Sequence, residues 1–522
     1  MTNPTDPAIN GAESLVHTLL AAGVDTCFSN PGTSEMHFVA ALDHIPGMRS
    51  VLTLQEGVAT GAADGYYRMA GKTACTLLHL GPGLANGLSN LHNAKKAGSG
   101  VLNIIGEHAQ SHIDLDAPLT SDIEGIARPV SHWVHSSKSV GDLGADAVQA
   151  VQAANTAPGQ VAALILPSDT AWTEGGIVAD PQPAPQRPDF DRSQLRAATT
   201  ALSGPDSLLL LGGAALTEDN LLLAGRISAA TGCALLSEWA NARMDRGAGR
   251  VTVGRVPYPI DQALKVLAPY KRIVLVGARA PIGFFAYPGK PAVLTADGAE
   301  IIHLAHTGSD LAAALVALCD GAGASATPPA HVAKAAVPDK PKGGLTPDNI
   351  ADLLGRAIPE GAVVVDESVT TGRSFFPATQ GAPKHVWLNN CGGSIGYGLP
   401  VAIGAAIAAP KAKVMALTGD GSAMYTLQAL WTMARENLDV TVVIFANRSY
   451  RILRGELTNV GVGNPGPRAI DMLSLDRPNL DWVQMARGMG VEGVAVTDCD
   501  GLEAALADGL AMSGPYLIEA VM

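Results

Sequence analysis

The sequence alternates short apolar runs with longer segments of helical periodicity along most of its length. In the first third, this pattern predicts a helix at 10–23 and strands at 25–28, 51–54, 74–79 and 101–106. Strands separated by helix-length segments are typical of a parallel sheet covered by helices. We therefore expect the chain to begin with an α/β unit.

Two changes in composition divide the rest of the chain. A proline-rich segment at 181–190 predicts a domain boundary, and a stretch rich in Ala, Pro, Gly and Lys at 321–344 predicts a linker. Further strands are predicted at 207–211, 272–276, 362–366, 413–417 and 440–445, and helices at 398–409 and from about 427. The predicted fold class is α/β, in three domains that each contain a mostly parallel sheet flanked by helices, at 1–180, 187–322 and 345–522, with a linker at 323–344.

Composition excludes several classes of protein. The 522 residues are 47% apolar and 16% charged, which is typical of a globular protein rather than a disordered one. A net charge of −13 predicts no nucleic-acid partner, and no apolar run is long enough to predict a membrane span. The six cysteines form no CxxC pair, so neither zinc nor disulfides are expected. The first residues, MTNPTDPAINGAESLV, have no basic start or apolar core, so we expect no signal peptide and a cytoplasmic location.

The segment LTGDGSAMYTLQALWTMARENLDVTVVIFANRSY (417–450) carries the clearest chemistry. An apolar strand ends at Gly419-Asp420-Gly421, a helix follows, and a second apolar strand ends at Asn447. A parallel sheet places both strand ends at the edge where ligands bind. Glycines allow backbone N–H groups to approach a phosphate, and the oxygens of Asp420 and Asn447 suit Mg²⁺. A tight turn after a strand is the structural alternative for the glycines alone.

This segment resembles the diphosphate-metal motif of thiamine diphosphate enzymes, in particular benzoylformate decarboxylase and acetohydroxyacid (acetolactate) synthases. The resemblance implies thiamine diphosphate with Mg²⁺, or Ca²⁺ in its place. It implies that Asp420 and Asn447 bind the metal through their side chains and Ser449 through its carbonyl oxygen. It also implies that the cofactor is contacted by Gly419, Gly421, Ser422, Asn447 and Tyr450.

A second segment, QEGVATGAADGY at 55–66, resembles the pyrimidine-domain motif of the same enzymes. Glu56 would then be the catalytic carboxyl group bonded to N1′ of the pyrimidine ring, although a glutamate favoured by the helix dipole is the simpler interpretation of that residue alone. By the same resemblance, the Gly393 carbonyl would accept from the 4′-amino group, and Ile395 would separate the two cofactor rings. The Thr370 hydroxyl would contact the diphosphate.

Two further positions favour a likeness to benzoylformate decarboxylase. Thr33, in NPGTSE, matches a serine that contacts the substrate carboxylate, and His79 matches an active-site histidine. A histidine at a strand end is often only a structural hydrogen-bonding group, but His79 could also transfer protons near neutral pH. Phe285 stands where the second catalytic histidine of that enzyme lies. Loss of this acid would hinder aldehyde release and favour carboligation through the C2 carbanion.

Other features leave the exact reaction open. Residues 120–134 resemble acetohydroxyacid synthases, which carry FAD, and Gly212-Gly213-Ala214 and Gly277-Ala278-Arg279 are weak dinucleotide-like turns. FAD is therefore undecided. The first hypothesis is a 2-oxo acid decarboxylase or carboligase, which would take a 2-oxo acid and in some reactions an aldehyde or a second 2-oxo acid. The alternatives are an acetolactate synthase-type carboligase on pyruvate and a catalytically idle regulatory subunit.

The resemblance also implies an assembly and a pocket wall. Related enzymes are homodimers or homotetramers, with sites at the subunit interface. Ile452 and Leu453 would form an apolar wall of the site, whereas Arg451 and Glu456 could reach it or remain solvated.

Overall fold

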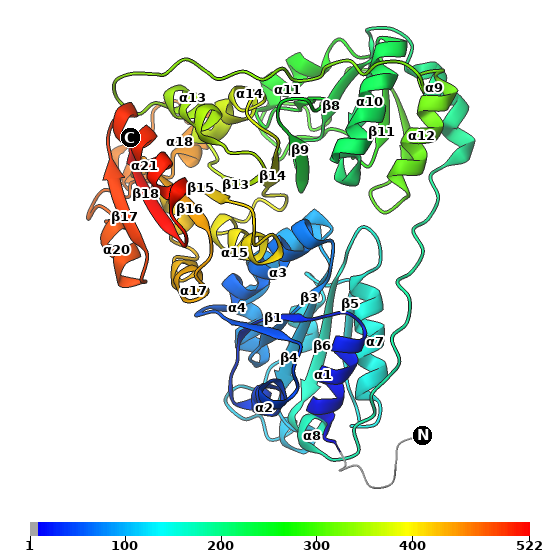
Figure 1. The fold of residues 1–522 in the computed structure, drawn as a ribbon, viewed down its shortest axis with the longest axis vertical. Coiled ribbons are helices and arrows are strands. Elements are labelled where there is room, and N and C mark those ends of the chain that lie inside the picture. Colours follow the sequence, from blue (N-terminus) through cyan, green and yellow to red (C-terminus); the bar gives the residue numbers. More distant parts are fainter. Residues whose placement is uncertain (1–8) are drawn as a thin grey trace.

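Three sheets built mainly of parallel strands organise the computed structural model, which describes residues 9–522 (Figure 1). The prediction of three mostly parallel sheets flanked by helices is confirmed. The expectation about a leader, and the start of the predicted domain 1–180, concern first residues that lie outside the described range. No helix in residues 9–522 has the length and apolarity needed to cross a membrane.

The first sheet has the strand order β2-β1-β3-β4-β6-β5, and all its pairs are parallel. Strands β3, β4 and β6 are buried along their whole length because helices cover both faces. Its strands are β1 Thr26–Asn30, β2 Arg49–Leu52, β3 Ala74–Leu78, β4 Val101–Glu107, β5 Trp133–Ser136 and β6 Val161–Pro167. Its helices are α1 Gly11–Ala21, α2 Met36–His44, α3 Glu56–Ala70, α4 Leu80–Ala97, α5 Gln110–Ile113, α6 Ile123–Ala127, α7 Leu143–Ala154 and α8 Ser168–Trp172.

The middle sheet has the order β10-β8-β7-β11-β12. The predicted strands 207–211 and 272–276 are β7 and β11, which pair along their whole length in the centre of this sheet. Its strands are β7 Ser207–Leu211, β8 Ala234–Ser237, β10 Gly254–Arg255, β11 Arg272–Val276 and β12 Glu300–Ala305. The helices around it are α9 Leu195–Ala201, α10 Glu218–Thr231, α11 Ile260–Leu267 and α12 Leu311–Gly321.

The third sheet has the order β17-β18-β16-β15-β13-β14-β9, and it takes its edge strand from the middle of the sequence. Strand β9, Arg243–Arg246, lies within the predicted domain 187–322 but pairs antiparallel with β14. The other strands are β13 Ala362–Glu367, β14 His385–Asn389, β15 Val414–Gly419, β16 Val440–Ala446, β17 Glu492–Val496 and β18 Tyr516–Val521. The helices are α13 Pro347–Ala357, α14 Phe375–Ala378, α15 Gly398–Ala408, α16 Asp420–Ala423, α17 Ala429–Arg435, α18 Arg451–Asn459, α19 Pro467–Asp471, α20 Trp482–Gly488 and α21 Cys499–Ala511.

Two connecting segments lack helix and strand where the sequence predicts breaks. One, between α8 and residue 191, runs along the right side of Figure 1, and the other, between α12 and α13, crosses its top. The second segment is bonded to the surface it crosses, because Ala330 N–H donates to the Gly225 carbonyl and Ala336 N–H to the Gly381 carbonyl. The linker predicted by composition is therefore a packed strap, and its second half is bonded too, through the Pro338 and Gly343 carbonyls.

Helices α3 and α15 form the main contact between the first and third sheets, and they cross near the centre of Figure 1. A Cβ atom on Gly65 would lie 2.1 Å from the Val401 carbonyl oxygen, and one on Gly404 would lie 1.8 Å from that of Ala62. The two backbones approach this closely only because both positions are glycine. The contact fixes Glu56, the first residue of α3, relative to the loop that precedes α15.

Candidate active site

The carboxyl edge of the third sheet brings the predicted metal ligands together. Strands β15 and β16 are parallel neighbours with Gly419 opposite Phe445, so Asp420 and Asn447 follow them at the same edge. The Asp420 carboxylate accepts hydrogen bonds from the N–H groups of Gly421 (2.9 Å) and Arg448 (2.6 Å). Burial raises the pKa of Asp420, and these two hydrogen bonds oppose that shift. A buried carboxylate without a charged partner is a site that a cation would stabilise.

The residues after β16 complete this edge. Asn447 Oδ1 accepts from the Ser449 N–H (3.1 Å), and the Ser449 hydroxyl oxygen is buried with no hydrogen-bond partner among residues 9–522. The Tyr450 ring covers Gly421, where a Cβ atom would lie 2.6 Å from it. Around Gly419, by contrast, a Cβ atom would meet nothing closer than 4.0 Å, and Ser422 beside it is buried. The edge therefore offers one carboxylate, one amide and open backbone.

These donors fit a hydrated metal-diphosphate group. The described residues contain no cluster of three or more His, Cys, Asp or Glu side chains that could hold a metal ion. Mg²⁺ commonly binds through one or two carboxylates together with phosphate and water oxygens, so Asp420, Asn447 and a backbone carbonyl suffice when a diphosphate supplies the rest.

A cavity of about 820 Å³ opens beside this edge. It is lined by the predicted residues Thr370, Asn447 and Ser449, by helix α18, and by aromatic side chains of the middle unit. The aromatic rings that line it are Tyr258, Phe284 and Tyr287. Polar and aromatic groups that converge in one cavity are typical of a small-molecule site.

Helix α18 is fastened to the middle unit through Glu456. The Tyr287 hydroxyl donates to the Glu456 carboxylate at 2.5 Å, and burial together with this bond raises the pKa of Tyr287. Arg451 and Ile452 line the cavity as well, whereas Leu453 is 44% exposed and does not. Of the residues proposed for the apolar wall, Ile452 therefore faces the cavity in this chain.

The middle unit contributes Phe284 rather than Phe285 to the cavity. The register of the sequence singled out Phe285, but that ring packs against Phe284 with centroids 4.8 Å apart and is absent from the cavity lining. The Phe284 ring lies over Gly393, where a Cβ atom would approach it to 2.6 Å. In the sequence, only its position next to Phe285 could have indicated this residue.

Glu56 and His79 lie together at the carboxyl edge of the first sheet. Glu56 is buried at the start of α3, and its carboxylate accepts from the Asn86 amide at 3.0 Å. Both side chains flank Gly83, where a Cβ atom would lie 3.2 Å from Glu56 Oε1 and 3.4 Å from His79 Cβ. The structure thus brings together two residues that helix α3 and strand β3 separate in the sequence.

His79 has a buried partner that sequence reasoning missed. Nδ1 of His79 lies 2.9 Å from Glu35 Oε2 and 3.2 Å from the Ser34 hydroxyl. Glu35 is fully buried and also accepts from the Gly32 N–H at 2.7 Å. When Glu35 accepts the Nδ1 proton, Nε2 is left as the nitrogen that exchanges a proton. Thr33, the residue expected to contact substrate, is exposed; its carbonyl accepts from the Met36 N–H, and its hydroxyl makes no hydrogen bond to the described residues.

The loop that carries Gly393 and Ile395 lies between these two edges. Gly393 has φ +79° and Gly396 φ +89°, a left-handed backbone that favours glycine. At its end, the buried Glu367 carboxylate accepts from the N–H groups of Tyr397 and Gly398, both at 2.9 Å. Burial raises the pKa of Glu367 to about 7. Ile395 is half-buried between Ser394 and Gly396.

The glycines of the middle sheet do not fit the pyrophosphate of FAD. A Cβ atom on Gly212 would lie 2.4 Å from Glu238 Oε1 and 2.5 Å from the Gly277 carbonyl oxygen. The two loops are therefore in contact, and a carboxylate stands beside them. The candidate turns at Gly212 and Gly277 therefore serve packing.

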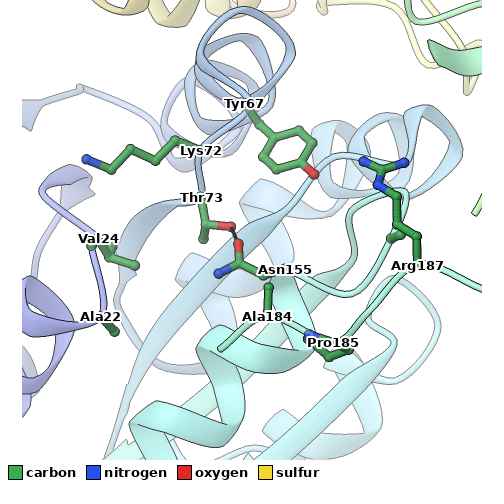
Figure 2. Close-up of a pocket in the computed structure, with 12 residues that line it drawn as sticks. Ala22, Val24, Tyr67, Lys72, Thr73, Asn155, Ala184, Pro185 and Arg187 are labelled. Carbon is green, nitrogen blue, oxygen red and sulfur yellow. Dashed lines mark hydrogen bonds between the residues drawn. The ribbon is translucent and has the colours of Figure 1, made fainter. Parts of the chain in front are cut away.

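A smaller cavity, of about 430 Å³, lies at the opposite edge of the first sheet (Figure 2). Helices α1, α3 and α7 all end beside it, and Thr73 donates to the Asn155 side chain at 2.7 Å. Lys72 and Arg187 line it as well, and Lys72 forms an ion pair with Asp25. None of the predicted site residues lines this cavity.

The fold and the two edges define an α/β protein with one sheet edge suited to a diphosphate and another that carries a buried glutamate. Residues 9–127 match the N-terminal TPP binding domain of thiamine pyrophosphate enzymes, and residues 370–520 match their C-terminal TPP binding domain. A Mycobacterium tuberculosis protein with the provisional name acetolactate synthase large subunit IlvX is 49% identical over 515 residues, which cover 98% of this chain and 99% of that protein.

Two more relatives extend the comparison. Benzoylformate decarboxylase of Pseudomonas aeruginosa is 29% identical over 95% of this chain and 96% of its own. The solved thiamine diphosphate-dependent 4-hydroxybenzoylformate decarboxylase of Rhodococcus jostii RHA1 has the same fold, with a TM-score of 0.86 at 24% identity over 98% of this chain and 99% of that one. The chain belongs to the thiamine pyrophosphate-dependent enzymes, related to both acetolactate synthases and benzoylformate decarboxylases.

Proposed function

We propose that this protein decarboxylates a 2-oxo acid, or joins its acyl part to a second carbonyl, with thiamine diphosphate and Mg²⁺. The observation that carries the proposal is the pair of His79 and the buried Glu35, beside Glu56 at one sheet edge. A buried carboxylate at Nδ1 holds the histidine in one tautomer. The Nε2 nitrogen can then exchange a proton with the oxygen that derives from the substrate carbonyl. When bound, thiamine diphosphate supplies the carbon nucleophile that adds to the 2-oxo group.

Each residue of the two edges has a role in this proposal. Asp420, Asn447 and the Ser449 carbonyl would hold the metal, and Gly419, Gly421, Ser422, Thr370 and Tyr450 would surround the diphosphate. Glu56 would exchange a proton with the pyrimidine N1′, and His79 Nε2 would exchange one with the substrate oxygen. The rings of Tyr258 and Phe284 would exclude water from the cavity, which strengthens these interactions.

The site is proposed to form between two copies of the chain. Neither hydrogen bonds nor ion pairs join Glu56 or His79 to Asp420, Asn447 or Ser449 within the described residues. A homodimer, or a homotetramer built from it, would bring the glutamate edge of one copy to the metal edge of the other.

Subunit complementation tests this arrangement. Glu56→Gln and Asp420→Ala, each inactive alone, should recover activity when co-expressed, because mixed dimers contain one site with both native residues. Random pairing predicts about a quarter of the wild-type rate per chain. If the mixture stays inactive while mixed dimers are demonstrated by mass spectrometry, each site lies within one chain.

Product analysis tests the reaction. The protein, with thiamine diphosphate and Mg²⁺, is given benzoylformate, pyruvate and other 2-oxo acids, first alone and then with an acceptor aldehyde, and products are identified by mass spectrometry. We expect ligation products, because Phe284 and Phe285 of the middle unit provide no acid that would promote release of the aldehyde. Simple aldehyde release without ligation would contradict that preference.

A second candidate, an acetolactate synthase-type carboligase on pyruvate, is favoured by the relative of 49% identity. Acetolactate formed from pyruvate alone would establish it. An idle regulatory subunit is disfavoured because Glu56, Asp420 and Asn447 are all present. Equal and low turnover in the wild type and Glu56→Gln would instead support the idle role.

A further inference from the structure

Three asparagines form a ladder along one face of α4. Asn86, Asn90 and Asn93 are spaced by four and three residues, so their side chains point the same way. The ladder faces both the start of α3 and the loop before α15. It therefore lies between Glu56 and the loop expected to contact the pyrimidine ring.

Asn90 bonds directly to both segments. Its amide nitrogen donates to the Gly57 carbonyl at 2.8 Å and to the Gly396 carbonyl at 3.2 Å. Its carbonyl oxygen accepts from the Asn93 amide at 3.0 Å. One buried side chain thus connects the residue after Glu56 with the far end of the loop.

Asn93 holds the middle of the same loop. Its amide nitrogen also donates to the Ser394 carbonyl at 2.9 Å, and its oxygen accepts from the Ser394 N–H at 3.2 Å. Asn90 and Asn93 are 1% and 0% exposed, so these bonds are what offsets the cost of burying two amides.

The bonding pattern leaves the Gly393 carbonyl available between two neighbours whose carbonyls are bonded. The carbonyls of Gly392, Ser394 and Gly396 all accept hydrogen bonds, from His92, Asn93 and Asn90. Within residues 9–522, no donor reaches the Gly393 carbonyl, and Gly393 is exposed. Its neighbours are fixed on both sides, so its direction is fixed too.

We propose that Asn90 and Asn93 are positioning residues that hold the loop before α15 and aim its Gly393 carbonyl. This role rests on the proposed function, because the carbonyl would act on the aminopyrimidine. A misplacement of about 1 Å in a reacting group lowers turnover by up to about a hundredfold.

The test uses full-length Asn90→Ala and Asn93→Ala, with Asn103→Ala as the matched control. Asn103 is fully buried in β4 of the same unit, accepts from Thr76 and donates to the Ala162 carbonyl, but does not touch the loop. Hydrogen exchange of the loop amides is measured without cofactor. Near-UV circular dichroism, kcat and KM are measured with thiamine diphosphate.

The two ladder variants should exchange the Ser394 amide at least about tenfold faster, since its acceptor is lost or displaced. Their kcat should fall about 10- to 100-fold with KM within about threefold, and the dichroism of the bound cofactor should change. Asn103→Ala should lower the melting temperature without these effects.

Three results would overturn the proposal. Unchanged exchange, dichroism and kcat in both ladder variants, or equal changes in Asn103→Ala, would leave the proposed function standing. A wild-type chain that binds no thiamine diphosphate would remove the proposed function itself. Exchange in the cofactor-free protein separates a failure of this proposal from a failure of the proposed function.

Discussion

The middle and third sheets share a topology and differ at the one place where that topology allows a site. In the middle sheet β7 lies between β8 and β11, and in the third sheet β13 lies between β14 and β15. In both, the chain moves first to one side of the starting strand and then to the other. Loops that diverge from two such strands create a crevice at their carboxyl ends. In the middle sheet, contact between Gly212 and Gly277 closes that crevice, whereas the third sheet is open at Gly419 beside Thr370 and Asp420.

The difference teaches that glycine after a strand has two uses. Gly212 leaves room for the next loop and for Glu238, so a tight turn packs without a ligand. The space beside Gly419 is not filled by protein atoms, because a Cβ atom there would meet only the Ser422 hydroxyl oxygen, at 4.0 Å. The first use stabilises the fold, and the second leaves space for a ligand.

The largest effect should come from the open edge. We expect Asp420→Asn to lower turnover at least about a hundredfold and abolish its dependence on Mg²⁺, because the amide cannot replace the charged ligand. Without cofactor, the variant should melt no lower than the wild type, since burial raises the pKa of Asp420 and its charge is held at a cost. Mg²⁺ titration of the rate and calorimetry measure the two effects. Full activity of the variant would show that Asp420 does not bind the metal.

A matched glycine pair separates the two uses. Gly212→Ala should destabilise the protein by about 1–3 kcal/mol, because its Cβ atom would overlap Glu238 and the Gly277 carbonyl. Gly419→Ala meets no such contact, so its stability should stay within about 0.5 kcal/mol while its affinity for thiamine diphosphate falls. Denaturant unfolding and cofactor titration measure both; a stable Gly212→Ala variant with weakened cofactor binding would reverse the assignment.

A smaller effect should appear where the two units meet. Tyr287→Phe removes the hydrogen bond from Tyr287 to Glu456, at a cost of about 1 kcal/mol. Because α18 lines the cavity, KM should rise by several fold while affinity for Mg²⁺ is unchanged. Steady-state kinetics at several Mg²⁺ concentrations provide the measurement, and an unaltered KM would show that the bond does not hold α18.

The sequence was sufficient for the parts of the molecule that depend on local pattern. Buried strands such as β7 and β11 read as apolar runs, and the Asp420 and Asn447 motif lies at two neighbouring strand ends. Pairing over long distances was not readable: β9 leaves the middle unit to join the third sheet, and Glu35 reaches His79 across the first sheet edge. The exchange of Phe285 for Phe284 depends on which way a loop turns, and no periodicity encodes that.

The smallest effect concerns the carboxylate that stands at the closed edge. Burial raises the pKa of Glu238 to about 7, above its value of about 4.3 in an unfolded chain. The folded protein therefore binds this proton more tightly, and the stability it contributes is present at low pH and is lost as pH rises from about 4.5 to about 7. Glu238→Gln removes this titration, so the difference in melting temperature between pH 5 and pH 8 should shrink without loss of activity. Burial raises the pKa of Glu367 as well, so the variant should keep part of the pH dependence of the melting temperature. An identical pH dependence in the wild type and the variant would mean that Glu238 is charged in the fold, and that the closed edge tolerates an anion after all.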